Sequence, residues 1–271
     1  MRYAYFPGCK IPHHLPEYGA SVQALCSALG ITLVPMEFSC CGWPIRHENP
    51  VASAYSAVRN FALAEREGLS ILTPCKCCFG NLKHAQAKMQ QDARLAAEVG
   101  NLLGKEGMRL PGKIDVHHLL TVLDRDVGAQ MLGELVRSPL SGVKVACHYG
   151  CHALRPGNVT EFDDPLAPTV FERILSATGA EMVHWDLRLE CCGHPLRGRD
   201  DTISNALMRK KLENARDAGA DILATGCTYC QMQFDQERHR IHETGDGTKK
   251  PTAVLFTRLL EAALGLAPRP F

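Results

Sequence analysis

The stretch Cys191-Cys192-Gly193-His194-Pro195-Leu196-Arg197 is a second copy of Cys40-Cys41-Gly42-Trp43-Pro44-Ile45-Arg46. Each copy reads Cys-Cys-Gly, one variable residue, proline, an aliphatic residue and arginine. A disulfide between adjacent cysteines strains the peptide that joins them, so these doublets are better suited to binding a metal cluster than to bridging. The glycine permits a positive φ and a close backbone approach, and the proline stiffens the end of the turn. The repeat therefore predicts a loop that holds sulfur atoms in place.

Each cysteine group in the first half of the chain follows a predicted strand. The strands are runs of apolar and β-branched residues, at Arg2–Phe6, Ile31–Phe38 and Leu69–Thr73. They lead into Cys9, the first doublet and the group Cys75-Lys76-Cys77-Cys78. Helices are expected at Glu17–Leu29, from Pro50 to Gly68, and at Asn81–Val99. Because strands that alternate with helices form parallel sheets, we expect the cysteines to gather at one edge of such a sheet.

The second half of the chain repeats this order. Strands are expected at Val143–Ala146, Ala180–Trp185 and Ile222–Thr225, and they lead into Cys151, the second doublet and the group Cys227-Thr228-Tyr229-Cys230. Helices are expected at His117–Leu123, Phe171–Thr178, Asp201–Asp217 and Val254–Leu264, with a polar loop at Gly245–Pro251. A repeat of this length indicates duplicated structural units. The sequence predicts an α/β fold of two similar lobes with mainly parallel sheets, residues 1–125 and 143–271, joined by a linker at 126–142.

Composition and charge narrow the class of protein. The 271 residues are 45% hydrophobic and can bury one large core or two of ordinary size. The 30 basic and 29 acidic residues nearly cancel, which argues against general binding to nucleic acid or to anionic lipid. Residues 1–9 are too short and too polar for a signal peptide, and no apolar run reaches the roughly 18 residues of a transmembrane helix. We therefore expect a soluble cytoplasmic protein.

Thirteen cysteines in such a protein are better explained by metal binding or catalysis than by disulfides, because cytoplasmic thiols are kept reduced. Ten of them recur in two sets of five, and the lengths of chain before and after the doublet are similar in the two sets. Cysteines that only fill a core would not repeat together with their glycines and prolines. Zinc sites use four ligands, so five thiolates per set favour an iron–sulfur cluster of unusual geometry, with zinc as the alternative.

The two sets resemble the cysteine pattern of the CCG-domain family, and within it that of heterodisulfide reductase B subunits. In that family each complete set of five cysteines binds one noncubane [4Fe-4S] cluster, and a heterodisulfide is split between two clusters. The resemblance covers nearly the whole chain. It also extends to CCG subunits of succinate dehydrogenase-like, glycolate oxidase, lactate-utilisation and sulfur-oxidising heterodisulfide-reductase-like complexes. It implies two clusters, held by Cys9, Cys40, Cys41, Cys75, Cys78, Cys151, Cys191, Cys192, Cys227 and Cys230.

The chain departs from the family pattern at two points. The spacers around the first doublet are short, and Cys147 competes with Cys151 as a ligand. We favour Cys151, because Gly150-Cys151 matches the turn at Gly8-Cys9. Cys26, within a predicted helix, and Cys77, between two ligands, are interpreted as packing or supporting residues.

Histidines and arginines near the cysteines are the candidates for catalysis. His148 and His152 flank the second site and suit metal binding, proton transfer or a structural hydrogen bond. Arg46 and Arg197 follow the two doublets at equivalent positions, and Arg155 follows Cys151. A guanidinium group there could neutralise cluster charge or bind an anionic thiol substrate, and a surface salt bridge is the alternative. The catalytic candidates are therefore Arg46, Arg197 and His152.

Two clusters would suit disulfide chemistry, which takes two electrons, because an iron–sulfur cluster usually passes one electron at a time. We therefore predict an oxidoreductase acting on sulfur groups, which reduces or forms a small-molecule disulfide. The chain has no ferredoxin cysteine run, no dinucleotide-binding glycine motif and no P-loop, so electrons must arrive through another protein. The family implies a ferredoxin-like C subunit and a flavin-bearing A subunit as partners.

Two other functions stay open at this point. The clusters could relay electrons to a flavoprotein or a quinone without acting on a disulfide, as in other CCG subunits. Alternatively, the cysteines could bind zinc and staple an interaction module. Methanogenic reduction of a heterodisulfide and bacterial sulfur oxidation are both compatible with the motifs.

Overall fold

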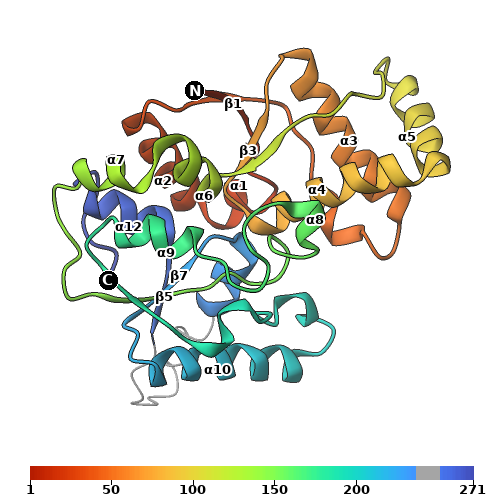
Figure 1. Ribbon diagram of the computed structural model, residues 1–271. Helices are drawn as coiled ribbons and strands as arrows, with labels where there is room; N and C mark the ends of the chain where they lie inside the picture. The colour runs from red at the N-terminus through yellow and green to blue at the C-terminus, as the bar shows by residue number, and fades with distance from the viewer. Residues whose placement is uncertain (236–250) are drawn as a thin grey trace. The chain divides into compact units, whose positions relative to one another are not determined.

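Two four-stranded parallel sheets organise the computed structural model of the chain, which describes residues 1–235 and 251–271 (Figure 1). Each sheet belongs to its own compact unit. Unit 1 contains Met1–Val122 and His152–Pro165, and unit 2 contains Leu123–Cys151 and Leu166–Phe271. The predicted α/β class with two similar lobes is confirmed.

The strands of unit 1 are β1 (Arg2–Tyr5), β2 (Thr32–Pro35), β3 (Ile71–Thr73) and β4 (Val116–His118), in the order β2-β1-β3-β4. All three pairings are parallel, so each connection crosses over through helices. The chain leaves β1 toward one neighbour and later returns to β3 on the other side. The ends of β1 and β3 therefore flank a topological switch point, where α/β proteins commonly bind ligands.

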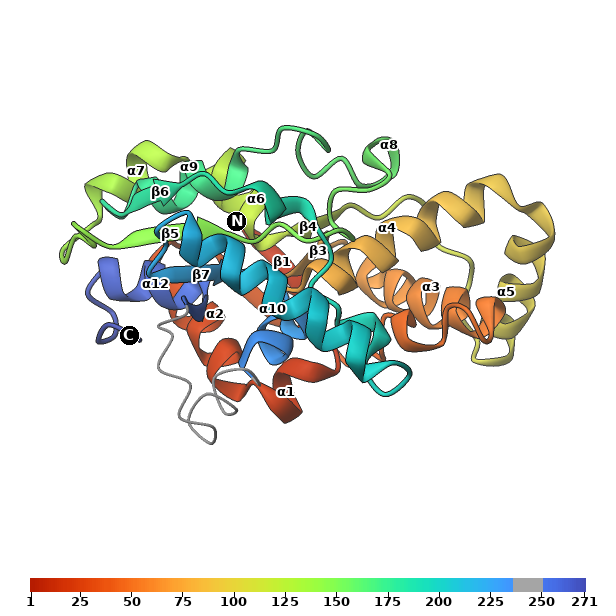
Figure 2. The ribbon, with the colours of Figure 1, turned by 90° about the horizontal axis from the view of Figure 1, so that it is seen from below.

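Unit 1 contains the helices α1 (Lys10–His14), α2 (Pro16–Ala28), α3 (Pro50–Arg66), α4 (Lys76–Gln91), α5 (Ala93–Lys105), α6 (Leu119–Val122) and α8 (Gly157–Thr160), with a short 3-10 helix at Trp43–Ile45. Helix α3 packs against both α4 and α5, as the views in Figures 1 and 2 show. Asn49 caps α3 by accepting from the N–H of Ala52 at 2.9 Å, and Pro50 starts the helix. The predicted apolar face of α3 buries Ala54, Val58 and Phe61.

Unit 2 repeats this topology. Its strands are β5 (Lys144–Cys147), β6 (Glu181–Val183), β7 (Ile222–Thr225) and β8 (Thr252–Leu255), in the order β6-β5-β7-β8 and again all parallel. The helices are α7 (Ala129–Glu134), α9 (Val170–Ser176), α10 (Asp201–Asp217) and α12 (Phe256–Ala263), with 3-10 helices at Asp186–Leu189 and His194–Leu196 and a π-helix at Leu123–Val127. Residues 228–235 are also helical. The switch point here lies between β5 and β7.

Residues 152–165 fall within the range predicted for the second lobe, but they group with unit 1. The chain thus leaves unit 2 directly after Cys151. Residues 126–142, predicted as a linker, group with unit 2 and include α7.

Three sequence-based element assignments differ from the structure. The helix expected at Asn81–Val99 is two helices, because Asp92 is extended and its side chain caps α5 at the N–H of Leu95 (2.9 Å). The helices expected from His117 and from Val254 are each preceded by an edge strand, β4 and β8. Strands of three or four residues show no clear alternation, so their sheet partners decide them. Of the polar loop predicted at Gly245–Pro251, all but the last residue lie outside the described chain.

The turn after β3 is held by two buried side chains. The hydroxyl of Tyr18 on α2 donates to the carbonyl oxygen of Pro74 at 2.7 Å. Nε2 of His118, at the end of β4, lies 3.0 Å from the same oxygen. Because Pro74 directly precedes Cys75, these contacts fix where that cysteine begins α4.

Cys26 on α2 is fully buried, and burial raises the pKa of its thiol from 9.0 to about 12. Because the thiolate is the reactive form, we expect iodoacetamide at about pH 8 to leave Cys26 unmodified in the folded protein and to modify it in urea. Its pKa is higher in the folded state, so its contribution to stability is complete below pH 9 and declines toward pH 12. Peptide mass spectrometry provides the measurement, and rapid modification of folded protein would contradict the packing role.

Candidate metal centre

The five predicted cysteines of unit 1 meet at the carboxyl end of its sheet. Cys9 follows β1, the doublet Cys40-Cys41 follows β2, and the group ending at Cys78 follows β3. The thiols form a hydrogen-bonded series in the order Cys9, Cys40, Cys41, Cys78 and Cys75. The Sγ atoms of Cys9 and Cys40 are 3.9 Å apart. Elements far apart in the sequence thus deliver sulfur to one place.

Unit 2 gathers its five cysteines in the same order. The series is Cys151, Cys191, Cys192, Cys230 and Cys227. Cys147, the rival considered for the first position, ends β5 and lies 4.0 Å from the Sδ of Met182. The turn after β5 therefore presents Cys151 to the doublet, as the turn after β1 presents Cys9.

Crowding shifts the pKa values of these thiols. Hydrogen bonds from Cys41 and Cys9 lower the pKa of Cys40 to about 3. The pKa values of Cys78 and Cys230 are raised well above 9.0, first by hydrogen bonds to neighbouring cysteines and then by burial. The protein by itself can therefore hold only a few of these groups as thiolates, whereas bound metal ions would stabilise all of them. An all-sulfur set of five donors is consistent with an iron–sulfur cluster in each unit.

Each set is more open on one side. In unit 1 Cys9 is exposed and Cys40 is half-buried, whereas the other three cysteines are buried. In unit 2 Cys151 and Cys191 are half-buried, and the other three are again buried. The first cysteine and the first member of the doublet thus form the accessible side in both units.

The glycine of each doublet loop is required by its geometry. Gly42 and Gly193 have φ of 86° and 89°, and each N–H lies 3.4 Å from the Sγ of the first doublet cysteine. A Cβ at either position would lie 2.4 Å from the carbonyl oxygen of Ser53 or Ser204. The hydroxyls of these serines donate to the glycine carbonyl oxygens at 2.9 and 3.0 Å. The two loops are therefore seated on their helices by the same contacts.

A buried polar side chain holds the backbone before each doublet. In unit 1, Asn60 on α3 donates from Nδ2 to the carbonyl oxygens of Ser39 and of the first doublet cysteine, at 3.3 and 3.2 Å. In unit 2, Lys211 on α10 donates from Nζ to the carbonyl oxygen of Glu190 at 3.0 Å and to that of Leu187. Asn60 and Lys211 are 0% and 1% exposed.

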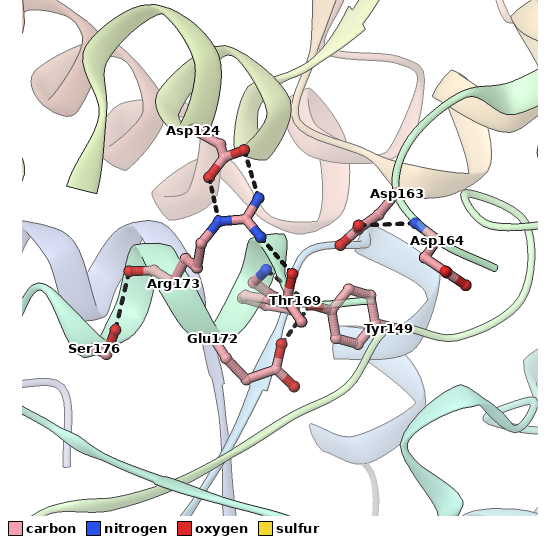
Figure 3. A network of polar contacts seen from close by, with 9 residues as sticks. Asp124, Tyr149, Asp163, Asp164, Thr169, Glu172, Arg173 and Ser176 are labelled. Atoms are coloured by element: carbon pink, nitrogen blue, oxygen red, sulfur yellow. Dashed lines mark hydrogen bonds and ion pairs between the residues drawn. The ribbon is translucent and has the colours of Figure 1, made fainter. Parts of the chain in front are cut away.

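Tyr149 fixes the turn that carries Cys151. Its hydroxyl donates to the carboxylate of Glu172 (Figure 3) and accepts from the N–H of Phe171 at 2.8 Å. Its N–H donates to the carbonyl oxygen of Arg188 at 3.0 Å, and the guanidinium of that arginine binds Glu172 at 3.1 Å. Burial, followed by the charge of Glu172, raises the pKa of Tyr149 and keeps the hydroxyl protonated. The turn is thus anchored by a charged network.

His148 lies beside the cysteine set of unit 2. Its Nε2 is 3.3 Å from the Sγ of Cys230, and the ligand atoms of His148, Cys192 and Cys230 lie within 4.8 Å of one another. Phe6 is its counterpart in unit 1, since the N–H groups of Phe6 and His148 bind equivalent carbonyls in β3 and β7 at 2.8 and 2.9 Å. The two sets therefore share a backbone frame but differ in neighbouring side chains.

A family model for a cysteine-rich domain, named CCG, matches residues 3–83 and 145–235. The two matched ranges contain all ten cysteines of the two sets. The chain belongs to the CCG family.

Several relatives are similar to this CCG protein over nearly its whole length. It is 32% identical over 99% of its length to a protein of Archaeoglobus profundus named as like the B subunit of heterodisulfide reductase, covering 92% of that protein. It is 33% identical over 97% to the 8-methylmenaquinol:fumarate reductase membrane anchor subunit of Wolinella succinogenes, covering 92%. It is 31% identical over 97% to the B subunit of the ferredoxin/F420H2-dependent CoB-CoM heterodisulfide reductase of Methanosarcina acetivorans, covering 89%.

The fold also occurs in a solved structure. The crystal structure of a hypothetical protein from Helicobacter pylori matches 97% of the CCG chain with a TM-score of 0.74 and 14% identity. The chain spans about half of that protein, 49% of its length. Within residues 1–235 and 251–271, no helix is both long enough and apolar enough to cross a bilayer.

Two of the catalytic candidates contact Trp43 in the first CCG domain. The guanidinium carbon of Arg46 lies 4.0 Å from the centroid of the Trp43 ring, and the indole Nε1 donates to Nε2 of His152 at 3.2 Å. The sequence associated His152 with the second site, but its ring belongs to unit 1. Arg197 is exposed and extended (ψ 131°), whereas Arg46 is helical (ψ −24°). The two arginines are thus equivalent in sequence but not in conformation.

Arg155 does not face the second cysteine set within unit 2, because it belongs to unit 1. Its carbonyl oxygen lies 3.3 Å from Nε2 of His84. Cys77 is buried on α4, as expected for a packing residue.

Sequence reasoning missed the anchoring residues Asn60 and Lys211. Each follows its doublet at the same distance along the chain, so superposing the two halves of the sequence would have paired them. The partners of Tyr149 carried no such signal, because Glu172 and Arg188 have no counterparts in a known motif.

We expect Gly193→Ala to destabilise the second CCG loop far more than Gly198→Ala. Both glycines have positive φ, which costs alanine about 1 to 2 kcal/mol. Only at Gly193 would the new Cβ meet backbone, at 2.4 Å from Ser204, which adds roughly 1 to 3 kcal/mol. The unfolding midpoint in urea provides the measurement, and equal losses in the two variants would contradict the close approach.

Proposed function

We propose that the chain is the iron–sulfur subunit of a heterodisulfide-reductase-like complex, which reduces a small-molecule disulfide or forms it in the reverse direction. Two complete sets of five cysteines carry the proposal, because disulfide reduction takes two electrons. Identities of 30% to 32% with proteins named as B subunits of heterodisulfide reductases, or as B-like, support it.

The residues that would hold two noncubane [4Fe-4S] clusters are Cys9, Cys40, Cys41, Cys75 and Cys78 in unit 1, and Cys151, Cys191, Cys192, Cys227 and Cys230 in unit 2. When bound, each cluster would supply one-electron transfer. The protein itself seats the doublets through Gly42 and Gly193 and leaves one side of each set accessible. That side is the position proposed for a sulfur substrate.

Arg46 is the strongest candidate for binding an anionic group of the substrate. Its guanidinium is held over Trp43, and its Nη1 donates to the carbonyl oxygen of Trp43 at 2.8 Å, so it has a defined position beside the first doublet. His152 orients the same indole. Arg197 is less suited to this role, because its exposed side chain is hydrated.

The proposed partners are a ferredoxin-like C subunit and a flavin-bearing A subunit, which would exchange electrons with this chain. The similarity to proteins named as subunits supports action within a complex. The chain itself has no dinucleotide-binding motif that would hold a nicotinamide or flavin cofactor.

A second function is favoured by one particular similarity. The chain is 33% identical to a subunit named for 8-methylmenaquinol:fumarate reductase, whose name refers to a quinol and not to a disulfide. The alternative is therefore an electron relay between a flavoprotein and a quinone. Both functions use the same cysteines and differ in whether a disulfide binds.

We expect anaerobically purified protein to contain about eight iron atoms, four for each cysteine set. Cys40→Ala should lose about half of this iron, whereas Cys77→Ala should keep all of it, because Cys77 is buried outside the hydrogen-bonded series. Elemental analysis together with electron paramagnetic resonance provides the measurement. Zinc in place of iron would contradict the proposal.

We expect the complex to oxidise a chemically reduced viologen dye when a small-molecule disulfide is supplied. Arg46→Ala should raise KM for an anionic disulfide while changing kcat little, because the guanidinium would bind the substrate in both ground and transition states. Arg197→Ala is the matched control. Iron-loaded complex that oxidises the dye with a quinone but with no disulfide would favour the relay instead.

A further inference from the structure

Two lysines are buried among the described residues, one in each unit, and each lies close in sequence or space to a cysteine set. Lys76, 3% exposed, is the first residue of α4 and lies between Cys75 and Cys77. Lys211, 1% exposed, is on α10. Burying an ammonium group is unfavourable unless negative charge or hydrogen-bond acceptors compensate it.

Carbonyl oxygens and an aromatic ring surround the Lys211 ammonium. It donates to the carbonyl oxygens of Glu190, at 3.0 Å, and Leu187, and it lies 4.8 Å from the centroid of the Trp185 ring. No carboxylate of the described chain forms a salt bridge with it. The contacts satisfy its hydrogen bonds but do not neutralise its charge.

The negative groups that act on Lys211 are mainly the cysteines of the second set. Burial lowers the pKa of Lys211 to about 8, and the charges of Cys192, Cys230, Glu190 and Cys191 oppose this shift. The side chain of Glu190 is exposed, so water screens its charge, whereas Cys192 and Cys230 are buried. The buried positive charge is therefore directed at the sulfur set.

Unit 1 makes the same anchoring contact without a charge. Asn60 occupies the position equivalent to Lys211, and both donate to the carbonyl oxygen of the residue before the doublet, Ser39 or Glu190. An amide therefore suffices to hold this backbone. The ammonium in unit 2 adds charge to a role that is already filled by a neutral group in unit 1.

We propose that Lys211 is a positioning residue that tunes the second cysteine site: it holds the backbone before the doublet and raises the reduction potential of the cluster in unit 2. The inference rests on the proposed function, because it requires a cluster there. A buried cation stabilises the reduced cluster, which carries one more negative charge, and the low dielectric of the interior strengthens this effect. The two clusters thereby differ in how readily they accept an electron.

The experiment compares Lys211→Asn with Lys210→Asn in the anaerobically purified full chain. The first variant gives unit 2 the residue of unit 1, and the second removes the same charge from an exposed position on the same helix. We measure iron content and follow the cluster signals by electron paramagnetic resonance in a redox titration. We expect about half of the signal in Lys211→Asn to move to more negative potential at unchanged iron content. Lys210→Asn should titrate as the wild type does.

Unchanged potentials in iron-replete Lys211→Asn, or an equal shift in Lys210→Asn, would overturn the tuning role. If Lys211→Asn loses iron, Lys211→Gln and Lys211→Arg decide. Retention of iron by the arginine variant alone would support a need for charge, and loss in both would overturn the tuning role by showing that lysine is required for its shape. Wild-type protein that binds zinc and no iron would instead overturn the proposed function.

Discussion

The repulsion among five closely spaced sulfur donors is the constraint on which each unit depends. Thiols so close to one another cannot all ionise, and hydrogen bonding between neighbours already raises the pKa values of Cys78 and Cys230. A fold that assembles them must fix every turn that carries them. The parallel sheet does so by ending two adjacent strands at a switch point, where turns from distant parts of the sequence converge.

Rigid turns follow from this constraint. Gly42 and Gly193 take up left-handed conformations that bring their loops within contact of Ser53 and Ser204. The turn at Cys75 depends on carbonyl contacts to buried side chains, and the turn at Cys151 on the Tyr149 network. Each anchor uses a different chemistry for the same purpose, which is to keep a cysteine from relaxing away from its neighbours.

Duplication preserved the frame and let the surroundings of the sulfur atoms diverge. The contacts that seat the doublet loops are nearly the same length in the two units. Phe6 corresponds to His148, Trp43 to His194, and Asn60 to Lys211. Such exchanges change charge and hydrogen bonding at a metal cluster without moving its ligands. The two sites are therefore alike in ligand geometry and unlike in electrostatics.

The sequence by itself determined the α/β class, the duplication and the grouping of ten cysteines, because glycine, proline and cysteine spacings are local and repeat. Only the tertiary structure decided the edge strands β4 and β8, the placement of His152 beside Trp43, and the different conformations of Arg46 and Arg197. Edge strands of three or four residues are stabilised by pairing with a neighbour rather than by their own pattern. The partner of a side chain such as His152 or Lys211 is set by packing between segments far apart in the chain, which spacing alone does not encode.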